Sequence, residues 1–381
     1  MRTSLTYEEQ LDLLVQKSEG VSEYSWEELV DILGLDISST TLRKSWNNLF
    51  GGYSVMKYLE DKDIASLPDD LYKLKDELYK ERVRLQDVNR ENRQGLREEG
   101  RYERLVEVLK KEMQDLEPIK LAPYNQDNEY NGHIYGVACF SDWHYGALID
   151  NQWNYYDTEV AKSRANKLVD KILYHSAIHG VTDLIIEING DMIEGEIMVS
   201  VKTGAEEDTI QQIIHVSELL AQCINKLRPC FNSIKIVTTL GNHGRLGYAP
   251  KNSYATQENF EMLIPEFLRL RLNMPIHSSH GLDFTEYEIG DKMICVSHGQ
   301  HDKMSTIIAD FAQIYKRVPD EVHVGHLHQP SDKNDRDTQV VVNGSLVGSG
   351  DFSLQCRKVT KPSQTMIVYD VDRCVYNLEV E

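Results

Sequence analysis

The 381-residue sequence has no long apolar run. No stretch approaches the roughly 18 consecutive apolar residues that a membrane-spanning helix needs. The first ten residues, MRTSLTYEEQ, contain no apolar core of the kind that a signal peptide carries. We therefore expect neither a membrane span nor a secretory leader.

Cysteine is scarce, and its spacing forms no motif. The six cysteines lie at positions 139, 223, 230, 295, 356 and 374, and no two of them form a CxxC pair. Most stand in apolar contexts such as Ala138-Cys139-Phe140. This pattern is typical of reduced thiols in the core of a cytoplasmic protein, so we expect a cytoplasmic location.

Positive charge is also in short supply. The sequence has 41 Lys and Arg against 61 Asp and Glu, which gives a net charge of -20. This balance argues against a protein that binds nucleic acid over its whole surface. It does not exclude a nuclease, because bound metal ions and a small basic patch can supply positive charge locally.

The spacing of apolar residues divides the chain into four parts. We expect a small helical domain at 1–66 and a charged helical or coiled-coil segment at 67–117. A linker at 118–132 contains Pro118 and Pro123, and an α/β domain occupies 133–381.

The region 1–66 carries the pattern of a candidate helix-turn-helix. Helices are expected at 6–17, at 26–33 and from Ser38 onward, with a short break at Gly34. Arg43 and Lys44 would then lie on the exposed face of the recognition helix. The alternative is a helical interaction module, since 1–66 holds twelve acidic residues and only six basic ones.

The segment 67–117 has apolar residues near heptad spacing, with charges of both signs between them. The apolar positions are Leu71, Leu74, Leu78, Leu85 and Val88. One interpretation is a coiled coil that joins copies of the chain into a homo-oligomer. The other is a solvated linker helix. Gly95 and Gly100 predict two helices or one bent helix.

The region 133–381 alternates apolar strand-like runs with helical patterns. Strands are expected at 134–140, 183–188, 234–239, 284–289, 292–297, 321–324, 340–342 and 366–369. Helices are expected at 157–179, 209–227, 256–272 and 303–317, the third one broken or kinked at Pro265. The pattern predicts a layered α/β domain whose later strands pair as hairpins.

Polar residues of an unusual kind follow five of these strands. They are Asp142-Trp143-His144, Gly190-Asp191, Gly241-Asn242-His243, Ser297-His298-Gly299 and Gly325-His326-Leu327-His328. Ligands bind at the carboxyl ends of strands in α/β sheets, so we expect these residues to converge on one site.

The residue types favour a pair of divalent transition metals. Imidazole with carboxylate favours zinc, iron or manganese over magnesium or calcium. Asp142 and His144 alternate by two, as do His326 and His328, so each pair shares a face of an extended chain. The two oxygens of Asp191 can bridge two ions. Each motif alone is weak, but five in order, each after a strand, make a specific signal.

The series DxH, GD, GNH, H and GHxH resembles the signature of the calcineurin-like metallophosphoesterases, over roughly 133–345. The resemblance implies a four-layer α/β sandwich, in which two mixed β-sheets are flanked by helices. It implies two divalent metal ions, manganese first, with iron or zinc as alternatives. The implied metal ligands are Asp142, His144, Asp191, Asn242, His298, His326 and His328, with Asp191 bridging. His243 is implied as the catalytic residue that faces the scissile phosphate.

The resemblance is nearest to the SbcD-like DNA-repair nucleases, and the arrangement is similar to nucleases of phages. That branch usually reads GNHD, and Gly244 replaces the aspartate here. We expect a two-metal phosphodiester hydrolase, in the first place a DNA nuclease. The alternatives are a small-molecule or nucleotide phosphodiesterase and a non-catalytic assembly subunit of a DNA-processing complex. Arg357, Lys358 and Lys361 are candidates to meet phosphates near the site.

Overall fold

The computed structural model divides the chain into two compact units, residues 1–93 and 94–381. It describes residues 5–18, 20–35, 37–47, 79–80, 83–84, 103–104, 106–124, 132–197, 199–245, 259–279, 281–350, 353–354 and 357–381. Most of the predicted coiled-coil segment, and with it the oligomer prediction, lies outside these residues. Among the described helices, none has the length and apolar character to cross a membrane.

The first unit contains the three predicted helices. They are α1 (Tyr7–Ser18), α2 (Trp26–Ile32) and a helical stretch at 39–47. Ser25 caps α2 in a capping box with Glu28, so the helix begins where its side chain accepts a backbone N–H. Buried Leu29, Leu33 and Leu42 hold the helices together.

The larger sheet of the second unit has the strand order β13-β12-β1-β4-β5-β6. Its strands are β1 (Tyr135–Phe140), β4 (Asp183–Asn189), β5 (Ser233–Thr239), β6 (His277–Ser278), β12 (Ser363–Tyr369) and β13 (Arg373–Glu379). Neighbours from β1 to β6 are parallel, whereas β12 pairs antiparallel with β1 and with β13. The sheet is therefore mixed.

The smaller sheet has the order β10-β11-β9-β8-β7. Its strands are β7 (Phe284–Ile289), β8 (Lys292–Ser297), β9 (Glu321–Val324), β10 (Ser331–Asp335) and β11 (Thr338–Val342). The pairs β7–β8 and β10–β11 are antiparallel, and β9 is parallel to both of its neighbours. A hairpin of β2 (Ile149–Asn151) and β3 (Asn154–Tyr156) stands apart.

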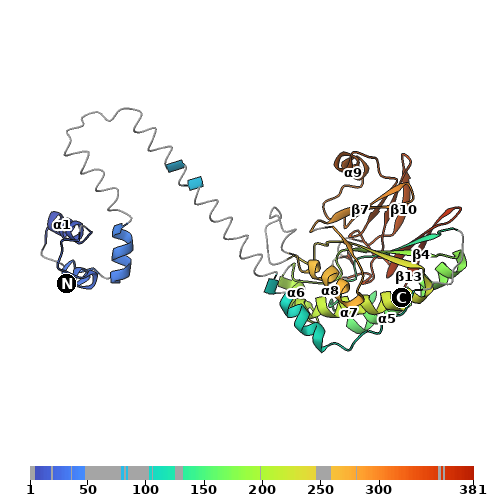
Figure 1. The fold of residues 1–381 in the computed structure, drawn as a ribbon, viewed down its shortest axis with the longest axis horizontal. Helices are drawn as coiled ribbons and strands as arrows, with labels where there is room; N and C mark the ends of the chain where they lie inside the picture. Colours follow the sequence, from blue (N-terminus) through green and yellow to red (C-terminus); the bar gives the residue numbers. More distant parts are fainter. Residues whose placement is uncertain are drawn as a thin grey trace. The chain divides into compact units, whose positions relative to one another are not determined.

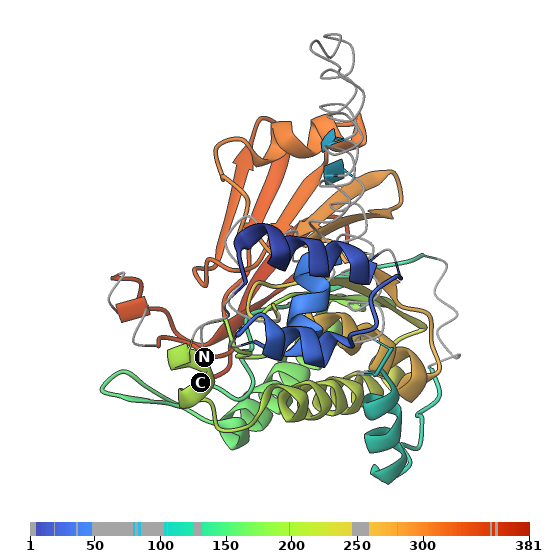
Figure 2. The ribbon, with the colours of Figure 1, turned by 90° about the vertical axis from the view of Figure 1, so that its left-hand side faces the viewer.

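The two sheets pack face to face between layers of helices. Helices α5 (Thr158–His179), α7 (Thr209–Leu227) and α8 (Leu263–Leu272) lie together on the larger sheet, and α9 (Ile307–Tyr315) lies beyond the smaller one (Figure 1; Figure 2). Side chains of β1 alternate between two cores: Phe140 packs toward the helices and Val137 packs between the sheets. The predicted four-layer sandwich is confirmed.

Residues 106–124 contribute to the core of this second unit. Leu109 is buried among the residues that lie between α5, α7 and the larger sheet. The Ala122 N–H donates to Asn225, and the Arg228 guanidinium lies over the Tyr124 ring. The end of the predicted coiled segment and the beginning of the predicted linker are thus packed against the α/β domain.

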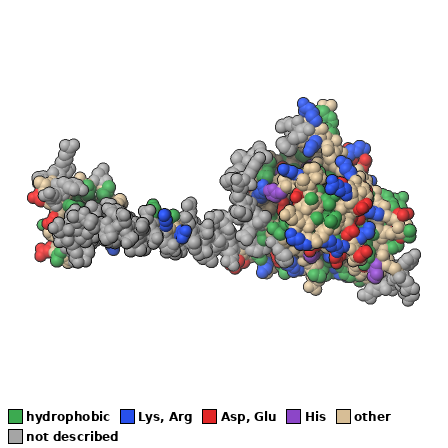
Figure 3. Space-filling view, turned by 90° about the horizontal axis from the view of Figure 1, so that it is seen from above, with side chains coloured by type: hydrophobic (Ala, Val, Ile, Leu, Met, Phe, Trp, Pro, Cys, Tyr) green, Lys and Arg blue, Asp and Glu red, His purple; other side chains and the backbone are tan. Residues whose placement is uncertain are grey.

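The predicted kink at Pro265 is wrong. A 3₁₀ turn at Phe260–Met262 precedes α8, which begins only at Leu263. Pro265 therefore lies in the first turn, where a backbone N–H has no partner within the helix, and the ring disturbs nothing. Strands β2, β3, β6, β10 and β13 were not predicted, and β10 in particular is a polar edge strand without an apolar pattern. Basic and acidic side chains are intermixed on the face of this unit seen in Figure 3.

Candidate metal centre

The residues expected to form the site come together at one edge of the two sheets. Asp142 and His144 follow β1, Asp191 follows β4, Asn242 and His243 follow β5, His298 follows β8, and His326 and His328 follow β9. Donor atoms of Asp142, His144 and His328 lie within 4.8 Å of one another. Those of Asp191, His298 and His326 form a second cluster of the same kind.

Five of the predicted ligands have a left-handed backbone. The φ angles are 55° at Asp142, 47° at His144, 51° at Asp191, 61° at His326 and 59° at His328. Such conformations are uncommon away from glycine, and each costs on the order of 1–3 kcal/mol. The extended-chain argument for the two alternating pairs is therefore wrong, although both pairs do converge on the site.

Hydrogen bonds between neighbouring loops hold these strained residues in place. The N–H of Asp142 donates to the Gly190 carbonyl at 3.1 Å, and the N–H of His144 donates to the Asp191 carbonyl at 3.0 Å. The N–H of His326 donates to the Asp142 carboxylate at 3.0 Å. The loops after β1, β4 and β9 thus fix one another, and strain is retained where it directs side chains into the site.

In the first cluster, two imidazole nitrogens lie close together. Nε2 of His144 and Nε2 of His328 are 3.3 Å apart, and the latter is 3.1 Å from Oδ1 of Asp142. Nδ1 of His144 lies 2.9 Å from the Glu194 carboxylate. With the proton on Nδ1, the lone pair of His144 Nε2 is directed at the cluster, as a metal ligand requires.

The second cluster is organised around His298, which is fully buried. Nε2 of His298 lies 3.0 Å from Oδ2 of Asp191 and 3.3 Å from Oδ1 of Asn242, while Nδ1 lies 2.7 Å from the Asn189 carbonyl. Burial opposes a charge on His298, but the carboxylates of Asp191 and Asp142 raise its pKa to about 10. The surroundings favour positive charge at this point, which is what a divalent ion would bring.

The carboxylate of Glu261 holds two loops of the site together, although no sequence motif identified this residue. Its buried carboxylate accepts the backbone N–H groups of Met192 at 2.6 Å, Gly241 at 2.7 Å and Asp191 at 3.2 Å. Burial, together with the charge of Asp191, raises the pKa of Glu261 to about 7. This side chain ties the loop after β4 to the loop after β5. The available signal was one acid inside the apolar run from Phe260 to Ile264.

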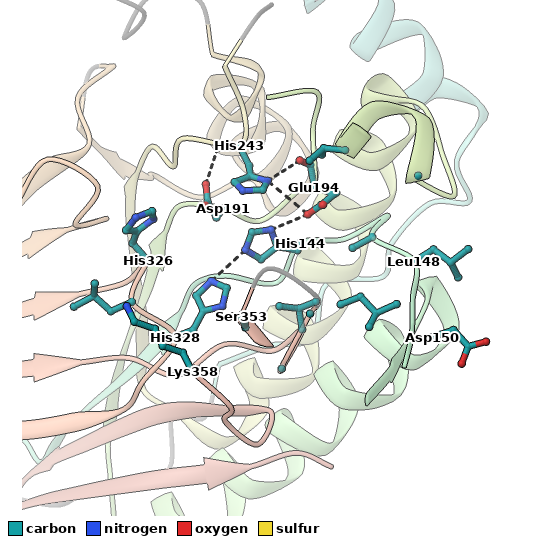
Figure 4. A pocket seen from close by; sticks show the side chains of 18 residues that line it. His144, Leu148, Asp150, Asp191, Glu194, His243, His326, His328, Ser353 and Lys358 are labelled. Atoms are coloured by element: carbon teal, nitrogen blue, oxygen red, sulfur yellow. Dashed lines mark hydrogen bonds and ion pairs between the residues drawn. The ribbon is translucent and has the colours of Figure 1, made fainter. Parts of the chain in front are cut away.

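Glu194 is the second residue that sequence reasoning missed. Its carboxylate lies 2.9 Å from Nδ1 of His144 and 3.5 Å from Nδ1 of His243. Its backbone carbonyl lies 2.8 Å from the same His243 nitrogen (Figure 4). Burial raises the pKa of Glu194, but the bond to His144 outweighs it and holds the pKa below its usual value. An acid three residues after Asp191 was the signal in the sequence.

Gly244 leaves no room for the aspartate of the GNHD pattern. A Cβ atom there would lie 2.1 Å from Oδ1 of Asn259 and 2.7 Å from Cγ of Glu261. Both neighbours are fixed by hydrogen bonds to the Gly241 backbone. The acidic partner of His243 is therefore Glu194, which approaches from another loop.

A cavity of about 480 Å³ opens over these residues. His144, Asp191, His243, His326 and His328 line it. Of the three basic residues expected near the site, Lys358 lines the cavity. Lys361 pairs with Glu379 at 3.2 Å, and the Arg357 guanidinium donates to the Leu354 carbonyl.

Comparison with known proteins decides the family. The calcineurin-like phosphoesterase superfamily domain matches residues 171–373. The chain belongs to this superfamily.

Relatives of this phosphoesterase include the SPbeta prophage-derived uncharacterized protein YonJ of Bacillus subtilis (strain 168). It is 24% identical over 369 residues, which cover 91% of this chain and 89% of the relative. Solved structures match at lower identity. An archaeal phosphodiesterase is 15% identical over 64% of this chain and 99% of its own, with a TM-score of 0.34. A predicted phosphoesterase from Streptococcus pneumoniae TIGR4 is 12% identical over 66% and 94%, with a TM-score of 0.28.

The donor set of this phosphoesterase fits two divalent metal ions. Asp142, His144 and His328 would hold one, His298, His326 and Asn242 the other, and Asp191 stands next to both sets. Ions bound here would polarise the phosphoryl group and supply an activated water. The protein itself supplies the oriented ligands, and His243 lies beside them with its Nδ1 2.8 Å from the Glu194 carbonyl oxygen.

Proposed function

We propose that this phosphoesterase is a two-metal phosphodiester hydrolase that cleaves DNA, with manganese as the preferred ion. The observation that carries the proposal is the convergence of two ligand clusters and His243 on one cavity. The imidazoles and carboxylates of this set suit manganese, and iron or zinc would fit the same donors.

In this proposal His243 acts on the leaving group. Its Nδ1 is held by Glu194, so Nε2 can donate a proton to the alkoxide oxygen as the phosphorus–oxygen bond breaks. Water adds to phosphorus, and the products are a phosphomonoester and an alcohol. Hydrogen bonds between neighbouring loops hold the backbone of Asp142, His144 and His326.

Three features support DNA as the substrate. Lys358 places one positive charge in the cavity, where a neighbouring phosphate of a strand could bind. The first unit has Arg43 and Lys44 on its exposed surface. The relative from Bacillus subtilis is described as prophage-derived, which supports the proposed similarity to phage-encoded nucleases.

The decisive experiment is cleavage of linear and single-stranded DNA by the purified chain. We expect manganese-dependent cleavage that EDTA abolishes and that added manganese restores. Replacing Arg43 and Lys44 together by alanine should weaken DNA binding if the helical unit binds DNA. An unchanged affinity would make this unit a protein-interaction module.

A small-molecule or nucleotide phosphodiesterase is the second candidate. The cavity volume of about 480 Å³ lies in the range of sites for small ligands, roughly 300–1,000 Å³. Fast hydrolysis of bis-p-nitrophenyl phosphate and a cyclic nucleotide, without any DNA cleavage, would favour this candidate over the nuclease.

We also propose that the chain works in the cytoplasm as a homo-oligomer. The thiols of Cys139, Cys223 and Cys295 are free and buried, as expected in a reducing compartment. Light scattering on the full chain would measure its mass in solution. A monomer at micromolar concentration would contradict the oligomer.

A further inference from the structure

The lining of the cavity over the metal centre is chemically uneven. Five of its apolar lining residues form what we call the apolar wall: Ala147, Leu148, Ile149, Val201 and Val347. Figure 4 shows Leu148 of this wall on one side of the cavity and Lys358 beside His328 on the other, where Leu327, between His326 and His328 in the chain, is a further apolar lining residue. Among the described residues that line the cavity, Lys358 is the single cation. The site therefore distinguishes the two sides of a substrate that lies across the metals.

Leu148 is the residue of the wall that best supports a contact with substrate. It is 56% exposed, although it lies only four residues after the ligand His144. Val201 reaches the same cavity from α6 (Val199–Gly204), a separate segment of the chain. Neither side chain can bind a metal or move a proton. An apolar surface open to water at a catalytic cavity is what a substrate group would cover.

The wall lies on the side of the leaving group. Glu194 and His243 line the cavity together with the wall, and Figure 4 shows Glu194 between His243 and Leu148, with Lys358 on the opposite side of the view. Because His243 is placed to protonate the departing oxygen, the group attached to that oxygen would reach the wall. The group retained on phosphorus would extend toward Lys358.

We propose that the apolar wall is a nucleobase subsite for the leaving nucleoside, and that Lys358 binds the next phosphate on the retained side. This proposal rests on the nuclease function proposed above and adds the orientation of the strand. A base offers a flat apolar face to Leu148 and Val201. Asp150, which also lines the cavity, accepts hydrogen bonds from amino groups and repels a further phosphate. Charge and polarity on both sides of the cavity thus match a nucleotide strand.

The test compares leaving groups in full-length variants. Dithymidine phosphate has a departing nucleoside, whereas thymidine methyl phosphate can lose methanol. Leu148→Ser should lower kcat/KM for dithymidine phosphate by about tenfold, a size typical of lost apolar contacts in a pocket. It should change kcat/KM for loss of methanol less than about twofold by the same reasoning. Leu270→Ser is the matched control, since Leu270 is 51% exposed on α8 and does not line the cavity.

Lys358 is tested with substrates that carry one more phosphate. Lys358→Ala should raise KM for trithymidylate and reduce the dependence of KM on salt, with little effect on dithymidine phosphate. Lys361→Ala, whose side chain pairs with Glu379, is the control. Thermal melting of each variant separates loss of folding from loss of binding.

The outcomes distinguish the subsite from the function. Equal losses on both thymidine esters, or no loss on either, would overturn the nucleobase subsite while the nuclease stands. If Leu148→Ser lowers kcat/KM only for bis-p-nitrophenyl phosphate, the wall binds an apolar group other than a nucleobase. If the wild-type protein cleaves bis-p-nitrophenyl phosphate but no nucleotide ester, the nuclease proposal fails and the subsite fails with it.

Discussion

The carbonyl oxygen of Glu194 lies 2.8 Å from Nδ1 of His243, and its carboxylate lies 2.9 Å from Nδ1 of His144. One residue therefore orients both a predicted metal ligand and the predicted general acid. The loop after β4 that carries it also carries Asp191, whereas His243 lies on the loop after β5, so Glu194 links the two loops. The absence of an acid at Gly244 is compensated from the loop after β4.

Replacing Glu194 by glutamine should disturb the orientation of both His144 and His243. The backbone carbonyl remains, but the charge beside His144 and His243 is lost. We expect kcat/KM to fall by roughly 10–100-fold and metal affinity to weaken, as for other outer carboxylates of metal sites. Kinetics and metal titration by calorimetry measure the two effects. Glu196→Gln is the control, because Glu196 pairs with Lys202 instead. Unchanged kinetics and affinity would show that the carbonyl alone suffices.

His243→Ala should separate chemistry from metal binding. We expect turnover to fall by about 10²–10⁴-fold, the usual contribution of a positioned acid. The metal content measured by mass spectrometry should stay at the wild-type level. His215→Ala serves as a control, since His215 is exposed and pairs with Glu207. Loss of metal from the first variant would make His243 a ligand and contradict the assignment of roles.

Gly244→Asp should not produce a more active phosphoesterase. The new side chain would displace Asn259 or Glu261, which hold the loops after β4 and β5. Overpacking of this kind costs about 1–3 kcal/mol, so we expect a lower melting temperature and lower activity. Gly132→Asp is the comparison, because a Cβ atom at Gly132 meets no heavy atom within 4 Å. Wild-type stability of Gly244→Asp would refute the steric argument.

Removal of the metal should destabilise the second unit. The clusters hold two buried carboxylates, Asp142 and Asp191, and a bound cation would stabilise their charges. A ligand at a hundred times its dissociation constant stabilises a fold by about 2.7 kcal/mol. We therefore expect EDTA to lower the melting temperature by several degrees, measured by calorimetry, and excess manganese to reverse the shift. An unchanged melting temperature would contradict metal binding by these residues.

A buried ionic network between the sheets should make stability fall at alkaline pH. Nδ1 of His323 lies 2.7 Å from the Glu187 carboxylate, and its Nε2 lies 3.4 Å from Glu321. Burial opposes protonation, but the two carboxylates raise the pKa of His323 to about 9. The folded pKa exceeds the unfolded value of about 6.5. The stabilisation of the folded state by protonated His323 is therefore complete below pH 6.5 and is lost as the pH rises through 9.

Urea unfolding at pH 6.5, 8 and 9.5 tests this network. The unfolding free energy of the wild type should decrease over the range. The double variant Glu187→Gln/His323→Gln should show a flatter profile, since it removes both charges together. His179→Gln is the control, because its ring contacts Tyr376 near the surface. Parallel profiles for wild type and double variant would exclude His323 as the titrating group.

The sequence by itself determined the layered fold and predicted which Asp, Asn and His residues gather at the candidate site. Short apolar runs predicted β1, β4, β5, β8 and β9, because a strand buried on both faces needs apolar residues along its length. Asp, Asn and His at the ends of these strands predicted the site, since carboxyl ends of neighbouring strands meet at one edge. Local pattern was enough for both conclusions.

Only the tertiary structure decided how the site is held. The left-handed backbone of Asp142 and His326 depends on hydrogen bonds to loops that are distant in sequence. Glu194 and Glu261 gain their roles from partners on other loops, and Gly244 is required by the approach of Asn259. No local pattern encodes these contacts, because each one exists only when segments far apart in the chain pack together.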